Sequence, residues 1–234
     1  MARRSSVRLA FPPFTYAVKW LVIINCAIYV LMLVASGLNI FSPTDVYVRL
    51  GIVPLLVVQH GWVWQLVTYA FIHGDITHLG MNSVWFLPFG SAVARRFGNL
   101  RVIGFFGATA AAGALTHLVT HWGELTPMIG ASAAVSGFMA GSIRFAFQRG
   151  GPLAMFRSEE PAAYLVPAAP LSSALRDPRI MVFLLAWFGL NLLFGIGSIG
   201  LPGGEQSIAW EAHIGGFLAG LLLFPLFDPV PAGT

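Results

Sequence analysis

Uncharged apolar runs of helical length recur along the chain, and the charged residues fall between them. A helix needs about 20 predominantly apolar residues to cross a bilayer. The runs cover residues 20–38, 76–94, 102–122, 126–143, 180–200 and 212–227. This pattern predicts an all-α membrane protein in which residues 1–234 form a single domain with a bundle of six transmembrane helices.

The composition points to the same class of protein. Hydrophobic residues make up 57% of the chain and charged residues 9%, whereas soluble domains carry roughly 25% charged residues. With so few charges, the net charge of +4 indicates orientation in a membrane rather than binding of nucleic acid, and no nucleic-acid partner is expected. The single cysteine, Cys26, excludes an intramolecular disulfide.

The basic residues set the orientation of the six predicted spans. If the N-terminus is cytoplasmic, every Lys and Arg except Arg49 falls in a cytoplasmic segment. The positive-inside rule predicts such a bias, and an odd number of spans would abolish it. We therefore expect both termini in the cytoplasm, an uncleaved first span, and a location in a cell membrane, expected to be a bacterial inner or plasma membrane.

Three segments lie outside the predicted spans. Residues 1–16 form a cytoplasmic tail. Residues 39–75 are external and mostly apolar, so we expect a loop that lies in the membrane interface. Residues 149–179 carry five prolines and are expected to form a flexible cytoplasmic linker. No internal repeat is evident, so the inverted-repeat architecture of many transporters has no support.

Polar residues inside the predicted spans are functional candidates, because they are costly in a bilayer. His78 and Asn82 are four residues apart and share one helical face. Ser132 and Ser136 have the same spacing in the fourth span, and the sixth span carries His213. In the predicted topology all three spans begin on the external side, so these groups could converge at one depth.

The depth of Ser132 follows from its distance along the helix to Arg144. Twelve residues separate them, or roughly 18 Å of helix, against a hydrocarbon core about 30 Å thick. Residues 124–130 would then descend as non-helical backbone, which is tolerated only where it is buried in protein or lines a water-filled cavity. A serine at a helix start has free N–H groups nearby that can bind an oxyanion, and His213 is the candidate general base.

Small residues could bring the fourth and sixth spans into close contact, which the pairing of Ser132 with His213 would require. Stripes of small residues permit close approach of helices in lipid. The two stripes contain Ala133, Gly137 and Gly141 in the fourth span, and Ala212, Gly216 and Gly220 in the sixth.

Three motifs resemble those of the rhomboid family of intramembrane serine proteases. Gly130-Ala131-Ser132 is similar to the family's Gly-x-Ser. Residues 212–220 are similar to its Ala-His-x-x-Gly-x-x-x-Gly, and residues 73–82 to its His-x4-His-x3-Asn. Trp64-Gln65 lies where many members have Trp-Arg. The motifs occur in the family's order along the chain.

The resemblance implies a Ser-His dyad, with Ser132 as the nucleophile and His213 as the base. It also implies that His78 and Asn82 assist the oxyanion. Four further residues are candidates for substrate contact or structural support: His73, Ser136, Gly130 and Trp64.

The sequence departs from the family pattern at three positions. Ala133 replaces a common glycine, Ser136 replaces an aromatic residue found in some members, and Gln65 replaces a common arginine. No acidic residue that would extend the dyad to a triad is evident. Glu211 is two residues from His213 and so points about 200° away around the helix.

The resemblance predicts an endopeptidase that needs no cofactor and cleaves transmembrane segments from the non-cytoplasmic side, with substrate helices and the lipid bilayer as its partners. Two alternatives remain. One is a rhomboid-like pseudoprotease that only binds transmembrane helices, although such proteins usually lack the serine or the histidine. The other is a small transporter, which would need a polar path across the whole membrane.

His117 and His121 are also four residues apart. Two histidines without a His-Glu-x-x-His motif do not define a metal site, so no metal is expected and these residues are expected to be structural or interfacial.

Overall fold

The computed structural model of the protein describes residues 15–153, 160–197 and 209–231. Most of the described chain is helical, and its one β-type pairing is an isolated antiparallel bridge between Ile52 and Met128. The longer helices are α1 (Tyr16–Gly37), α5 (Ile76–Phe97), α6 (Asn99–Thr120), α7 (Ser132–Ile143), α9 (Pro178–Gly197) and α10 (Trp210–Phe227). The shorter ones are α2 (Pro43–Leu50), α3 (Pro54–His60), α4 (Gln65–Thr68), η1 (Tyr69–Phe71), η2 (Pro161–Tyr164) and α8 (Leu171–Ala174).

Each predicted apolar run coincides with one of the longer helices. The largest shift is at the fourth run, where α7 begins only at Ser132 and residues 124–130 are non-helical, as the expected depth of Ser132 requires. The predicted tail at residues 1–16 lies almost wholly outside the described residues, as does the end of the fifth run at 198–200.

Three helices of the described chain, α1, α6 and α10, are long and apolar enough to cross a bilayer. The helix α7 and residues 178–193 of α9 are apolar but shorter. By contrast, α5 is long enough to cross a bilayer but less apolar. It carries His78 and Asn82 near its start and two arginines in its last turn. The apolar helices identify a multi-pass membrane protein.

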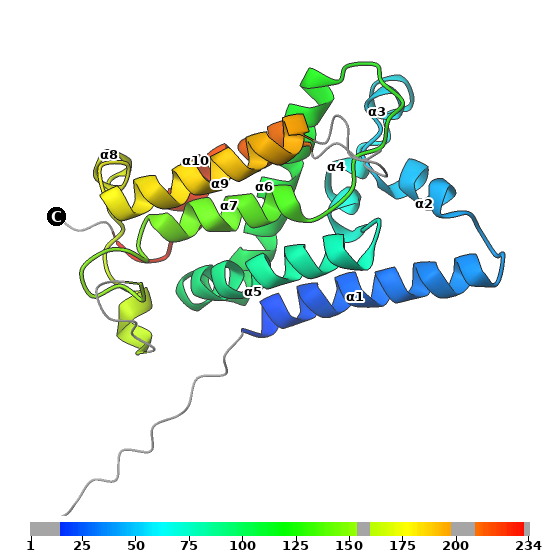
Figure 1. Cartoon of the computed structure of the whole chain (residues 1–234). Helices are drawn as coiled ribbons and strands as arrows, with labels where there is room; N and C mark the ends of the chain where they lie inside the picture. Colours follow the sequence, from blue (N-terminus) through cyan, green and yellow to red (C-terminus); the bar gives the residue numbers. More distant parts are fainter. Residues whose placement is uncertain (1–14, 154–159, 198–208, 232–234) are drawn as a thin grey trace, which may run out of the picture.

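The helices α1, α5, α7, α9 and α10 run lengthwise through the molecule, whereas α6 rises steeply across them (Figure 1). The first residues of α5, α7 and α10 lie at the end that carries α2, α3 and α4, whereas α1 begins and α10 ends at the opposite end (Figure 1). The predicted convergence of three helix starts is therefore present.

The helix α7 is the centre of the bundle. Every residue from Ala133 to Ile143 is buried, and α7 packs against α5, α6 and α10. A Cβ atom at Gly216 would lie 2.0 Å from the carbonyl oxygen of Ala133, and one at Gly220 would lie 2.2 Å from that of Gly137. The backbones of α7 and α10 are therefore in direct contact, and the glycines of both predicted stripes provide the space.

A buried ion pair closes the end of the bundle opposite to α2–α4. Arg96, at the end of α5, lies 2.8 Å from Asp228, which follows α10, and the Arg96 side chain is fully buried. The same guanidinium donates to the carbonyl oxygens of Tyr164 and Val166. These bonds hold part of the predicted linker at 149–179 against the bundle. The flexibility of this linker stays a prediction.

A buried polar side chain, Gln65, holds together the segment at residues 39–75. Gln65 is fully buried; its amide oxygen accepts from Val53 N at 3.0 Å and its amide nitrogen donates to Val48 O at 2.7 Å. Trp64 is half-exposed and donates its Nε1–H to Arg49 O. Gln65 thus supplies buried hydrogen bonds within the loop, and half-exposed Trp64 adds one more, to Arg49 O.

This loop also supports the non-helical segment at residues 124–130. Ile52 and Met128 exchange two backbone hydrogen bonds of 2.9 Å, and Gly130 N donates to Tyr69 O. Leu55 N donates to Glu124 O. These bonds satisfy backbone groups that would be costly to leave unpaired in a membrane protein.

We expect Gly220→Ala to destabilise the protein, because its methyl group would collide with backbone rather than with a movable side chain. Overpacking of this kind costs about 1–3 kcal/mol. Gly107→Ala is the matched control, since nothing lies within 4 Å of a Cβ atom at that position of α6. Thermal unfolding in detergent should show a lower midpoint for Gly220→Ala alone, and equal midpoints for both variants would contradict the backbone contact.

Candidate active site

A strained turn precedes Ser132 and sets the start of α7. Gly130 has φ +114°, a conformation that favours glycine. A Cβ atom there would lie 2.4 Å from Nε2 of His78. The position thus requires glycine for two reasons, and His78 of α5 lies against the backbone that leads into Ser132.

The structure brings Ser132 and His213 into hydrogen-bonding contact, as the sequence predicts. The Oγ atom of Ser132 lies 2.6 Å from Nε2 of His213, although 81 residues separate the two in the chain. Ser132 is the first residue of α7 and His213 lies in the first turn of α10. The contact between the two helix backbones is what gives these short side chains their reach.

A third side chain, Asn191 of α9, completes this arrangement. Its amide nitrogen donates to Trp187 O at 2.8 Å, which leaves its Oδ1 to accept a hydrogen bond from Nδ1 of His213. His213 then carries its proton on Nδ1, and its Nε2 presents a lone pair to the Ser132 hydroxyl. This is the tautomer that a general base needs.

Asn191 was not among the residues predicted for the site. The signal was present in the sequence, because Asn191 is a polar residue in an otherwise apolar span, and such residues are functional candidates by default. Its neighbour Trp187 stacks on Phe217 with ring centroids 5.3 Å apart. That contact helps to hold α9 against α10.

The other predicted residues of α5 lie near this pair without an observed bond to Ser132. Asn82 is buried and donates one amide N–H to His78 O at 3.0 Å. His73 contacts His78 edge to face, with ring centroids 5.0 Å apart. The part of His78 and Asn82 in stabilising an oxyanion stays a prediction, as does substrate contact or structural support by His73.

Ser136 is engaged within its own helix. It is buried, and its hydroxyl donates to Ser132 O at 2.7 Å. Its proton is therefore used in a bond to the preceding turn, which is a structural role.

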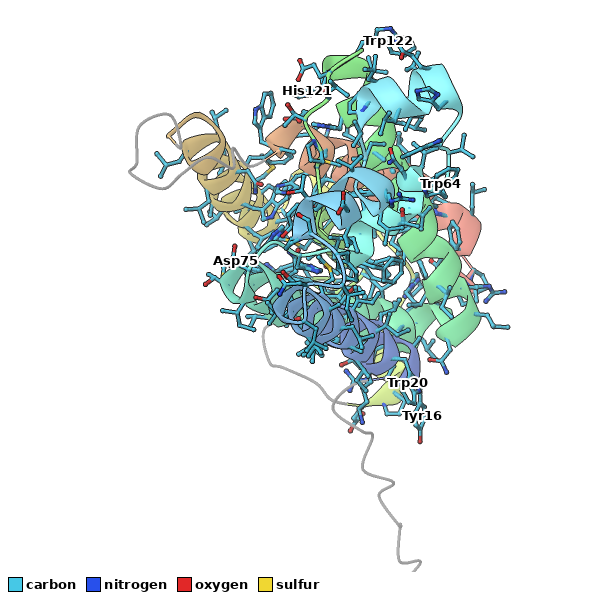
Figure 2. All side chains as sticks on the ribbon, turned by 90° about the vertical axis from the view of Figure 1, so that its right-hand side faces the viewer. Tyr16, Trp20, Trp64, Asp75, His121 and Trp122 are labelled. Atoms are coloured by element: carbon cyan, nitrogen blue, oxygen red, sulfur yellow. The ribbon has the colours of Figure 1, made fainter. Side chains whose placement is uncertain are left out.

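Glu211 points away from the Ser132–His213 pair, as its position two residues before His213 predicts. Its Oε1 lies 2.9 Å from Nδ1 of His117 and 3.6 Å from Nδ1 of His121. The two histidines of α6 thus acquire an acidic neighbour from α10, which their spacing in the sequence does not predict. Figure 2 shows His121 and Trp122 towards the end of the molecule that lies opposite to Tyr16 and Trp20.

Together, these side chains form a chain of groups, Asn191, His213 and Ser132, that can activate a hydroxyl. The start of α7 adds free backbone N–H groups, which favour a negative charge beside Ser132. An activated hydroxyl can attack a carbonyl carbon, and the N–H groups beside it can stabilise the oxyanion that forms.

Comparison with known families gives one match. The family model of the Rhomboid domain matches residues 60–228, which is most of the chain and includes Ser132, Asn191 and His213. No curated protein matches the chain significantly.

We expect the protein to lose stability on acidification because of His73, which precedes α5. Burial and then the neighbouring His78 lower the pKa of His73 from 6.5 to about 4. Between these values the unfolded chain binds the proton and the folded protein does not, so stability falls as the pH drops through this window. The full effect is on the order of 3 kcal/mol.

The measurement is the thermal midpoint between pH 7 and pH 4 for the unmodified protein, His73→Gln and His60→Gln. His73→Gln should make the dependence of the thermal midpoint on pH less steep. His60→Gln replaces an exposed side chain and serves as the control. A profile for His73→Gln as steep as that of the unmodified protein would refute the assignment.

Proposed function

Because the chain belongs to the rhomboid family, whose members are intramembrane serine proteases, we propose that it is a serine endopeptidase that cleaves transmembrane segments of other membrane proteins. The observation that carries the proposal is the distance of 2.6 Å between Ser132 Oγ and His213 Nε2. A merely structural serine at a helix contact would not need a histidine held in one tautomer by Asn191.

In the proposed mechanism, Nε2 of His213 takes the hydroxyl proton while Ser132 Oγ attacks the scissile carbonyl carbon. The tetrahedral intermediate collapses, and the histidine gives the proton to the leaving amine nitrogen. Water then attacks the acyl-enzyme, again with His213 as the base, and releases the carboxylate product and the free serine. A dyad oriented by an amide suffices for these steps, and no cofactor is required.

We assign the oxyanion to the start of α7. The backbone N–H of Ser132 is one proposed donor. Asn82 uses one of its two amide N–H groups on His78 O, and the second is the next proposed donor. The Nε2 atom of His78 faces Gly130, beside the same turn. Such donors act strongly where bulk water is excluded.

The proposed topology has six spans, α1, α5, α6, α7, α9 and α10, with both termini in the cytoplasm. The site then opens to the non-cytoplasmic side of a bacterial plasma membrane. Substrate helices must unwind locally, because a helical carbonyl is hydrogen-bonded and shielded. We therefore expect substrates with small or helix-weakening residues at the cut.

We expect Ser132→Ala and His213→Ala each to abolish cleavage of a transmembrane model substrate in reconstituted vesicles. Loss of the nucleophile or base should lower the rate by at least about 10³-fold. A fluorophosphonate probe should label the unmodified protein and neither variant. Ser142→Ala is the control, because Ser142 lies on the same helix and donates only to Met139 O. A protein that only binds transmembrane helices would be neither labelled nor active, and an active Ser132→Ala variant would end the proposal.

Asn191→Leu should lower kcat about tenfold with little change in KM, because it removes the acceptor that fixes the histidine tautomer. Loss of one such hydrogen bond is worth about 1–1.5 kcal/mol. Asn191→Asp keeps an acceptor oxygen and should retain more activity than Asn191→Leu. Equal activity of the two variants, at equal thermal midpoints, would show that Asn191 only packs.

A further inference from the structure

A second cluster of chemically active side chains lies where the end of α6 meets the start of α10. It consists of His117 in the last turn of α6, His121 directly after the end of α6, and Glu211 on α10. One ligand atom from each residue lies within 4.8 Å of the other two. The proposed proteolytic mechanism uses none of the three.

The spacing of these atoms suits a small tetrahedral ion. Glu211 Oε1 lies 2.9 Å from His117 Nδ1 and 3.6 Å from His121 Nδ1. Zinc bonds to nitrogen and oxygen are about 2.0–2.2 Å long, so neighbouring ligand atoms of a tetrahedral site lie ~3.3 Å apart. These two distances fall on either side of that value, and the histidine ligand atoms lie within 4.8 Å of each other.

His117 is the most deeply buried ligand of the cluster. The residue is 5% exposed, and the ring nitrogen that faces Glu211 is Nδ1. The rings of His117 and His121 are stacked with centroids 4.2 Å apart, so the two imidazoles lie side by side.

We propose that His117, His121 and Glu211 bind one Zn²⁺ ion. Two neutral imidazoles and a carboxylate are a donor set typical of zinc, and they leave a fourth position for water. The ion replaces two hydrogen bonds, the one between Glu211 and His117 and the one of 2.9 Å between Thr120 Oγ1 and His121 Nδ1. It reaches the site past His121, whose side chain is 33% exposed, whereas the other two ligands are buried.

The zinc site is separate from the Ser132–His213 pair. Glu211 and His213 are two residues apart on α10, which places their side chains about 200° apart around the helix. The ion would therefore join α6 to α10 without touching the reacting atoms. This third ligand from α10 revises the expectation, based on the two histidines alone, that no metal binds.

The test uses the full chain without a polyhistidine tag, purified in detergent with chelator and then freed of it. Isothermal titration with ZnCl₂ should give one site per chain, and Co²⁺ should produce the visible absorption bands of a tetrahedral complex. Loss of one ligand should weaken binding more than the 10–100-fold that loss of an outer hydrogen-bonding partner costs. We therefore expect His121→Ala and Glu211→Gln to bind Zn²⁺ at least about 100-fold more weakly.

His60→Ala is the matched control, since His60 is an exposed histidine of the loop at 39–75 and lies outside the cluster. Zinc should raise the thermal midpoint of the unmodified protein and of His60→Ala, but not that of His121→Ala, because only the folded state holds the site. His121→Ala should fold normally, since its side chain is partly exposed, and its midpoint without metal verifies this. Absence of stoichiometric binding, or equal binding by His121→Ala, would overturn the proposal.

Discussion

The direct contact between the backbones of α7 and α10 is the interaction on which the site depends. Within lipid, apolar side chains gain little by leaving their surroundings for a neighbouring helix, so close packing must supply the attraction. Gly216 and Gly220 meet the carbonyl oxygens of Ala133 and Gly137, and a methyl group at either glycine would separate the helices. A serine side chain is short, and it can reach a histidine on another helix only at such a separation.

A second constraint is that the non-helical approach to Ser132 must have its polar backbone groups satisfied. Residues 124–130 form hydrogen bonds with Ile52, Leu55 and Tyr69 of the loop at residues 39–75. Gln65 in turn fixes that loop from inside. The loop is therefore part of the support of the site, even though none of its residues lies in the Asn191, His213 and Ser132 chain. This explains how a helix can begin deep in the protein.

Periodicity, charge and small-residue stripes predicted the helices, the start of α7 and the pairing of Ser132 with His213. They marked Asn191 as a polar residue in an otherwise apolar span, but they could not predict which way α9 is rotated, and so could not pair Asn191 with His213. The prolines of residues 149–179 indicated a flexible linker, but they could not predict its bonds to Arg96 of a distant helix. Glu211 likewise has a partner that its local sequence does not indicate, His117, which lies 94 residues earlier on another helix. Local patterns carry no information on such pairings.

The buried Arg96 has a consequence for the order of events during synthesis. Its partner Asp228 follows 132 residues later, which takes roughly 10 s of translation at common rates. Until then Arg96 lacks its carboxylate partner, and under the proposed topology its charge favours retention of the end of α5 on the cytoplasmic side. Only after α10 has emerged can the same guanidinium close the bundle. Under the proposed topology, the same side chain first helps to orient α5 and later forms the ion pair that joins α5 to the residue after α10. The number of residues between Arg96 and Asp228 sets the delay between these roles.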